Sequence, residues 1–167
     1  MIHQEFLHQF IVWALLLVPE GIMMILAGLG FLGVFPPKKS SVLMGLAFGT
    51  ATFVFRVIFP GGLHVLTSLV SYIVLVYFLL KVSIKTAMLS CFISSFLVNI
   101  GQLLIAFPIL KLTGLTFDQT LSNPWLHVAF GWAGDAILGA IAFYTVVKRK
   151  PFILVPESNM KGGVNQG

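Results

Sequence analysis

Hydrophobic residues occur along this chain in long uninterrupted runs rather than in alternation with polar ones. The runs have lengths near the roughly 20 residues with which an α-helix crosses the hydrocarbon core of a bilayer. Backbone groups in lipid must be paired within the spanning structure, and barrel strands would alternate apolar and polar positions, so the runs predict helices. The five predicted spans are 6–34, 42–59, 63–80, 87–112 and 126–147.

The segments between the runs are short and carry residues that end helices. These junctions are 35–41, 60–62, 81–85 and 113–125. The first contains two prolines and two serines, which stop one helix and cap the next. The last is the longest predicted loop. Residues 1–150 are therefore predicted to form one all-α transmembrane domain, followed by a short tail at 151–167 without fixed structure.

Composition agrees with a lipid-embedded chain. Of 167 residues, 58% are hydrophobic and 9% are charged, which leaves too little polar surface to cover a water-soluble globule. The net charge of +5 does not predict nucleic-acid binding, because the cations separate apolar runs instead of clustering on a soluble face. The lipid bilayer is the predicted partner, and aromatic residues of the last run are typical of interfacial anchors: Trp125, Trp132 and Tyr144.

Lys and Arg are distributed unequally between the two sides of the predicted membrane, and cytoplasmic loops usually retain them. One side carries eight: Lys38, Lys39, Lys81, Lys85, Lys148, Arg149, Lys150 and Lys161. The other carries two: Arg56 and Lys111. The count predicts a multi-pass protein of the cell membrane with its N-terminus outside and its C-terminus in the cytoplasm.

Three ionisable residues fall at membrane depth: Glu20, Arg56 and Asp135. A charge at mid-bilayer costs roughly 2.5 to 3.5 kcal/mol even on lenient scales, so each needs a partner or a function. We expect Arg56 to pair with one of the two acids. The other acid is then protonated or hydrogen-bonded to Asn99 and Gln102, which are three residues apart on the fourth helix.

Both acids lie beside features that disturb a helix. Pro19 precedes Glu20 and has no N–H, so the carbonyl of Leu15 loses its helical partner. Three glycines near Asp135 allow another helix to approach closely: Gly131, Gly134 and Gly139. His64 opens the third helix on the same predicted side. Together these polar residues predict either a ligand or proton site, or a structural network that fixes the helix register.

Several motifs resemble known sites but lack the required context. Gly28–Gly33 matches the dinucleotide pattern G-x-G-x-x-G, yet it ends a predicted transmembrane helix and has no neighbouring strand. Gly45 and Gly49 form a G-x-x-x-G pair, which predicts a helix contact within the chain or between chains. Residues 131–135 have one residue too many for the G-x-G-D of intramembrane aspartyl proteases.

Cysteine and metal chemistry are not expected either. Cys91 is predicted to lie on the side away from His64 and His127, so it has no base beside it. His3 and His8 lack the spacing of a helical metal pair, and we interpret them as solvent-facing. The sequence therefore predicts no enzyme, no catalytic residue, no cofactor and no metal.

A resemblance accompanies these features. Its elements are the proline-interrupted first helix, the Pro36-Pro37-Lys38-Lys39 loop, the turn from Phe59 to His64, and Leu121-Ser122-Asn123-Pro124-Trp125-Leu126. Over residues 1–150 the chain resembles the membrane sensor region of bacterial histidine kinases of the peptide-quorum or sporulation type, which carry a GHKL ATPase domain. The resemblance implies a cytoplasmic C-terminus that leads toward a kinase.

The chain departs from that pattern after Lys150. Residues 151–167 contain neither a phosphoacceptor helix nor an ATP-binding motif. We therefore expect a noncatalytic protein of sensor or regulatory type that binds a ligand, a histidine kinase or another membrane protein. A small transport subunit that binds solute or protons, and a structural assembly partner, including a homo-oligomer, stay open as alternatives.

Overall fold

The computed structural model describes residues 2–59 and 62–153, with side chains from Phe6 onward. The chain is all-helical: helices make up 86% of the structure, and the described part contains no strand. Four helices are long and apolar enough to cross a membrane, and one bent pair of helices forms a fifth candidate. The predicted all-α class is thus confirmed, and the prediction of five spans compares with four to five candidate spans in the structure.

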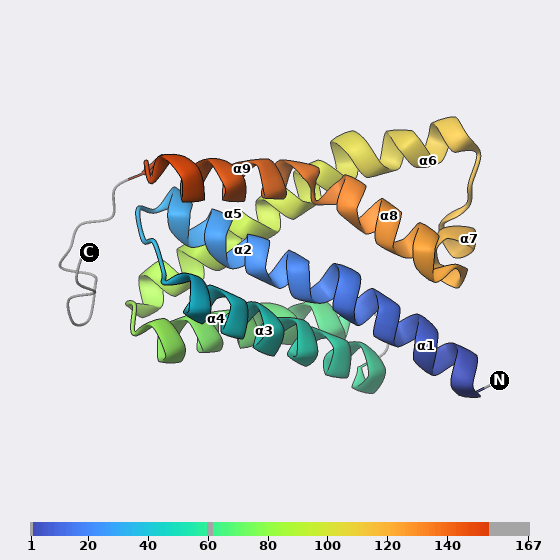
Figure 1. Cartoon of the computed structure of the whole chain (residues 1–167), viewed down its shortest axis with the longest axis horizontal. Helices are drawn as coiled ribbons and strands as arrows, with labels where there is room; N and C mark the ends of the chain where they lie inside the picture. Colours follow the sequence, from blue (N-terminus) through green and yellow to red (C-terminus); the bar gives the residue numbers. More distant parts are fainter. Residues whose placement is uncertain (1, 60–61, 154–167) are drawn as a thin grey trace.

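The candidate spans differ in regularity (Figure 1). The first consists of α1 (Ile2–Val12), the π-helical segment η1 (Trp13–Leu17) and α2 (Val18–Phe31). Two uninterrupted helices follow: α3 (Lys38–Ile58) and α4 (Leu63–Leu80). The fourth span consists of α5 (Ile84–Gly101), the π-helical segment η2 (Gln102–Ala106) and α6 (Phe107–Thr113). After the short α7 (Phe117–Ser122) come α8 (Pro124–Gly134) and α9 (Ala136–Lys148), bent by 57°.

The first span ends earlier than the expected residue 34. Gly33 has a φ of 81°, a left-handed conformation that glycine adopts without strain. The N–H of Val34 then donates to the carbonyl of Leu29 at 2.9 Å, which closes the helix in the manner of a Schellman motif. The last glycine of the G-x-G-x-x-G pattern therefore terminates a helix.

The expected loop at 113–125 contains a helix and two well-formed caps. At the start of α7, Thr116 and Gln119 form a capping box, with each side chain bonded to the other residue's backbone N–H. Asn123 then caps α8 by accepting from the N–H of Trp125 at 3.0 Å. Residues 113–125 are thus a helical connection, and the expectation of one long loop is corrected.

The helices form a bundle with two chemically different ends. Helix α1 begins at one end and α9 finishes at the other (Figure 1). The end that holds the α2–α3 and α4–α5 junctions carries most of the cations, and we call it the basic end. Its described cations are Lys38, Lys39, Lys81, Lys85, Lys148, Arg149 and Lys150. Two residues of the tail, Phe152 and Ile153, contact the bundle at this end, and their backbone N–H groups both donate to the carbonyl of Phe31. The prediction for residues 154–167 and the side chain of His3 lie outside the described residues.

Helix α2 is the central element and packs against α3, α5 and α9. A Cβ on Gly28 would lie 2.6 Å from the carbonyl oxygen of Ser90 on α5. On α3, a Cβ on Gly45 or Gly49 would collide with the first span, at Ile22 and at Leu17. The G-x-x-x-G pair is therefore an intrachain contact, which settles one of the two predicted alternatives.

A buried hydroxyl network joins three helices in the half of the bundle nearer the basic end, which we call the packed half. The Oη of Tyr72 lies 2.8 Å from the Oγ of Ser90 and donates to the carbonyl of Met24 at 3.2 Å. Ser94 donates to the same carbonyl at 3.0 Å. These bonds tie α2 to α4 and α5, within the main apolar core. This network was not predicted from the sequence.

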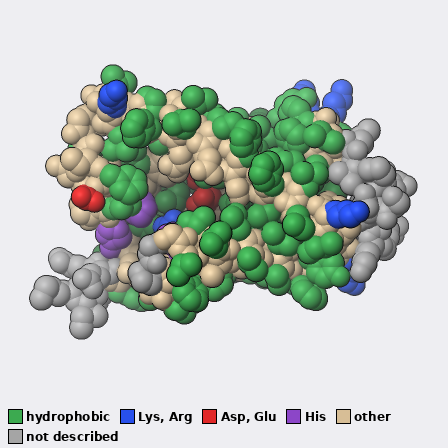
Figure 2. All heavy atoms as spheres, turned by 180° about the vertical axis from the view of Figure 1, so that it is seen from behind, with side chains coloured by type: hydrophobic (Ala, Val, Ile, Leu, Met, Phe, Trp, Pro, Cys, Tyr) green, Lys and Arg blue, Asp and Glu red, His purple; other side chains and the backbone are tan. Residues whose placement is uncertain are grey.

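Large apolar side chains also cover the outside of the helices (Figure 2). On α4 alone the exposed ones include Val65, Leu66, Val70, Val74 and Phe78. A water-soluble monomer rarely exposes such continuous apolar surface, whereas lipid solvates it. The surface therefore agrees with a membrane protein.

Candidate ligand pocket

A pocket of about 540 Å³ lies in the half of the bundle away from the basic end, which we call the pocket half. Figure 2 shows acidic, basic and histidine side chains gathered around a hollow at this end. The polar side chains that line it are His8, Glu20, Arg56, His64, Gln102, Thr120, His127 and Asp135. Apolar walls include Leu16, Phe59, Phe117 and Phe130. This volume lies in the range of small-molecule sites, which are mostly apolar with a few directed polar groups.

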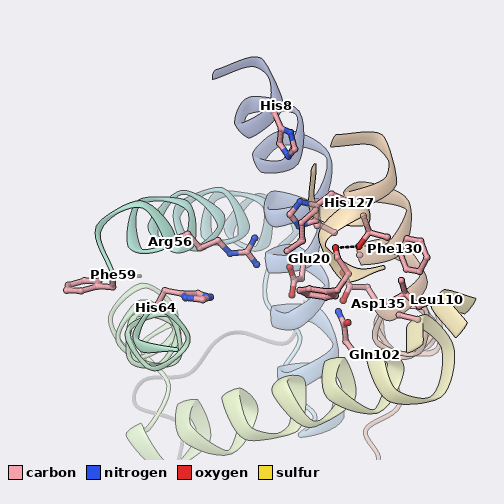
Figure 3. Close-up of a pocket in the computed structure, with 16 residues that line it drawn as sticks. His8, Glu20, Arg56, Phe59, His64, Gln102, Leu110, His127, Phe130 and Asp135 are labelled. Carbon is pink, nitrogen blue, oxygen red and sulfur yellow. Dashed lines mark hydrogen bonds between the residues drawn. The ribbon is translucent and has the colours of Figure 1, made fainter. Parts of the chain in front are cut away.

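The structure brings five of the six predicted site residues into this one pocket: Glu20, Arg56, His64, Gln102 and Asp135. They come from all five candidate spans (Figure 3). Helix counting could place them at a common depth, but only the packing of the bundle turns them toward a common space.

Asn99 is the predicted site residue that the pocket does not include. Its side chain is exposed on α5 and donates to the carbonyl of Ser95 on the same helix at 2.7 Å. Residues three apart differ by roughly 60° around a helix axis, so a shared face is only approximate. Gln102 reaches the pocket because it begins η2, next to the close contact between Gly101 and Gly134.

The charged side chains form a row across the pocket. The guanidinium of Arg56 points toward Glu20, and the two groups attract one another (Figure 3). Asp135 lies on the other side of Glu20, close enough for the two acids to repel. Of the two partners predicted for Arg56, Glu20 is the nearer one.

Asp135 occupies the break between α8 and α9. Its backbone has φ −84° and ψ 0°, and its carboxylate makes no capping bond to α9. The residue is only 2% exposed, and both carboxylate oxygens are buried without a hydrogen-bond partner. The predicted bond to Asn99 or Gln102 is therefore not formed. Other buried groups without partners occur in the described chain, but Asp135 is the acid among them.

All three helix irregularities of the described chain lie beside this pocket. Segment η1 contributes Leu16, segment η2 contributes Gln102 and Ala106, and the bend contributes Asp135. Short π-helical segments inside α-helices occur frequently at functional sites. In lipid, such irregular backbone is tolerated only where protein buries it or a cavity adjoins it.

Trp132 supplies a hydrogen bond to the backbone carbonyl that Pro19 leaves without a helical donor. The indole Nε1 of Trp132 donates to the carbonyl of Leu15 at 2.9 Å, the carbonyl that was predicted to lose its helical partner. The bond joins η1 to α8, so it fixes the first span against the bent one. Trp132 was expected to be an interfacial anchor, and the structure instead gives it this contact between spans.

Two histidines of the site were not predicted from the sequence. His8 and His127 line the pocket near its rim, with ring centroids 6.2 Å apart. The Nδ1 of His127 is buried without a hydrogen-bond partner. His8 was interpreted as solvent-facing because its own helix offers no second ligand. The sequence did contain a signal for them: His8 precedes Glu20 and His127 precedes Asp135, each toward the predicted outer side of the membrane.

Two other predictions concern chemistry elsewhere. Cys91 lies in the packed half, where its Sγ contacts the carbonyl of Leu69 at 3.7 Å, and it does not line the pocket. Among the described residues, no group of three or more His, Cys, Asp and Glu side chains could hold a metal ion.

In comparisons with protein-family models, with curated proteins and with solved structures, nothing matches the chain. The resemblance to the sensor region of histidine kinases therefore stays a prediction.

Proposed function

We propose that this chain is a noncatalytic multi-pass membrane protein of sensor or regulatory type that binds a small ligand in the pocket. The observation that carries the proposal is Asp135, an acid buried at a helix break with two unpartnered oxygens, on the wall of a cavity. A purely structural polar network would be expected to satisfy its own members, because a half-satisfied one destabilises the fold.

In this proposal the pocket faces the outside and the basic end faces the cytoplasm of the cell. The positive-inside tendency supports that orientation, since the basic end carries seven described cations: Lys38, Lys39, Lys81, Lys85, Lys148, Arg149 and Lys150. Arg56 and Lys111 are the described Lys and Arg residues nearer the pocket end. The protein then resides in the cell membrane.

The bend at Asp135 supplies a route from ligand to cytoplasm. A ligand that contacts Asp135 more favourably at one bend angle would shift the population toward that angle. Because α9 runs from the break to the basic end and packs on α2, the shift would move the helix end that faces the cytoplasm. A histidine kinase or another membrane protein that reads this end is the proposed partner, and a second copy of this chain is another candidate.

A small transport subunit is the second candidate function. Discontinuous spans also occur in secondary transporters, where such breaks bind solute and coupling ions. Here the bent pair α8 and α9 and the two neighbouring acids favour it.

One pair of experiments separates the candidates. Copurification from native membranes of a kinase or response regulator, with signalling lost in Glu20→Gln and Asp135→Asn, would support the sensor. Solute uptake into proteoliposomes that both variants abolish would support the transport subunit. Asp118→Asn is the matched control, because Asp118 is an exposed acid that does not line the pocket. If the two pocket variants alter neither readout and only lower thermal stability, the pocket is structural and the proposal fails.

A further inference from the structure

The pocket lining holds one carboxyl group more than its guanidinium can balance. Its lining contains two carboxylates, Glu20 and Asp135, and one guanidinium, Arg56. The count takes the three histidines of the lining as neutral, as in the formal charge of the chain. Since Arg56 points toward Glu20, the carboxyl group without a balancing cation is that of Asp135.

The unpartnered groups of the lining are hydrogen-bond acceptors. Both oxygens of Asp135 are buried and make no hydrogen bond, and the same holds for the Nδ1 of His127. A carboxylate only accepts, and an imidazole nitrogen without a proton does the same. Groups of this kind are completed by a ligand that donates several N–H bonds and carries a positive charge.

The remaining walls suit an apolar body. Phe59, Phe117 and Phe130 come from three different parts of the chain, and Leu16 adds an aliphatic surface. Aromatic faces attract a nearby cation as well as apolar groups. A carboxylate or phosphate ligand would meet two acids here, and the cation that could bind it already faces Glu20.

We infer that the ligand of this pocket is a small organic monocation, an ammonium group on an apolar body, whose N–H groups bind Asp135. The inference rests on the proposed ligand-binding function and names its substrate class. The ammonium supplies the hydrogen-bond donors that the Asp135 oxygens lack, and the apolar body lies against the phenylalanine walls.

Three probes of one shape test this inference on the full chain in lipid nanodiscs. They are 2-phenylethylamine, which is cationic at pH 7, the neutral 2-phenylethanol and the anionic phenylacetate. Calorimetric binding and the shift in melting temperature are measured for each. We expect saturable binding of the amine and none of the other two. All three probes partition into lipid through the same ring, so a difference between them reports their charge.

Two pocket variants and one control variant locate the bound cation. Asp135→Asn should weaken amine binding by roughly 30-fold or more, since the partner of a buried charge is removed. Asp118→Asn, at an exposed acid outside the pocket, should leave it unchanged. Arg56→Gln should strengthen it several-fold, because the competing cation is gone. A residue with only a structural role would not produce this opposite pair of effects.

The outcomes distinguish this inference from the proposed function. Leu121 also lines the pocket. If phenylacetate or 2-phenylethanol binds and Leu121→Trp blocks that binding, the pocket binds a ligand but the inference of a cationic ligand is wrong. The inference of a cationic ligand is also wrong if Asp135→Asn does not weaken amine binding, or if the amine does not bind at millimolar concentration. The proposed function fails separately, through the signalling and transport readouts.

Discussion

The two halves of this bundle are built from the same spans, but the ionisable groups buried without partners in the described chain lie in the pocket half. In the packed half, Tyr72, Ser90 and Ser94 bond to one another and to the backbone of α2. In the pocket half, Asp135 and the Nδ1 of His127 are buried without partners. The main apolar core lies in the packed half, and the pocket half holds only a small cluster around Leu16 and Leu17.

The contrast indicates that different stretches of the same helices serve stability and ligand binding. Regular α-helix occupies the packed half, whereas both π-helical segments and the helix break adjoin the pocket, and close glycine contacts occur in both halves. A variant in the packed half should therefore change folding. A variant of the pocket acid should change binding while leaving folding intact or improved.

The largest expected effect is that of Gly28→Val in the packed half. The new side chain would overlap Ser90 and Ser94, where backbone and a bonded hydroxyl leave no room. Overpacking of this kind should lower the free energy of unfolding by about 3 kcal/mol, measured by SDS titration in mixed micelles. Gly62→Ala is the control, because a Cβ at Gly62 meets nothing within 4 Å. A Gly28→Val protein as stable as the control would contradict the close packing of α2 on α5.

Tyr72→Phe should have the next largest effect. It removes the donor to the carbonyl of Met24 and the contact with Ser90, and it leaves the ring in place. The free energy of unfolding should fall by about 1 to 2 kcal/mol. Tyr144→Phe, at an exposed tyrosine of α9, should change it much less. Equal losses in the two variants would mean that the buried network does not stabilise the packed half.

Asp135→Asn should shift the stability of the ligand-free protein in the opposite direction. The substitution removes a buried carboxylate without partners, so the free energy of unfolding should rise by about 1 kcal/mol. The same SDS titration measures it, with Asp118→Asn as the neutral comparison. A clear loss of stability would show that Asp135 holds the bent helices together, and it would erase the contrast between the two halves.

Trp132→Phe should produce the smallest effect. The variant keeps an aromatic ring but loses the bond from Nε1 to the carbonyl of Leu15. Hydrogen bonds between membrane helices contribute about 0.6 kcal/mol on average, and we expect a loss of that size. Trp125→Phe, on the same helix and exposed, is its control. Hydrogen exchange at residues 15–20 should increase only in Trp132→Phe if the indole fixes the kinked first span.

The sequence by itself determined the features that depend on local chemistry. Long apolar runs predicted the helices, Pro19 predicted a carbonyl at Leu15 without a helical partner, and the cost of burying charge singled out Glu20, Arg56 and Asp135. Each of these inferences needs only neighbours in the chain and the thickness of a bilayer.

Only the tertiary structure decided which side chains face one another. It turned His8 and His127 into the pocket, left Asn99 outside, and brought Trp132 to Leu15, a residue 117 positions away. The physical reason is the solvent. In water, polarity marks the outer face of a helix, but in lipid both faces are apolar, so the rotation of each helix follows from packing alone.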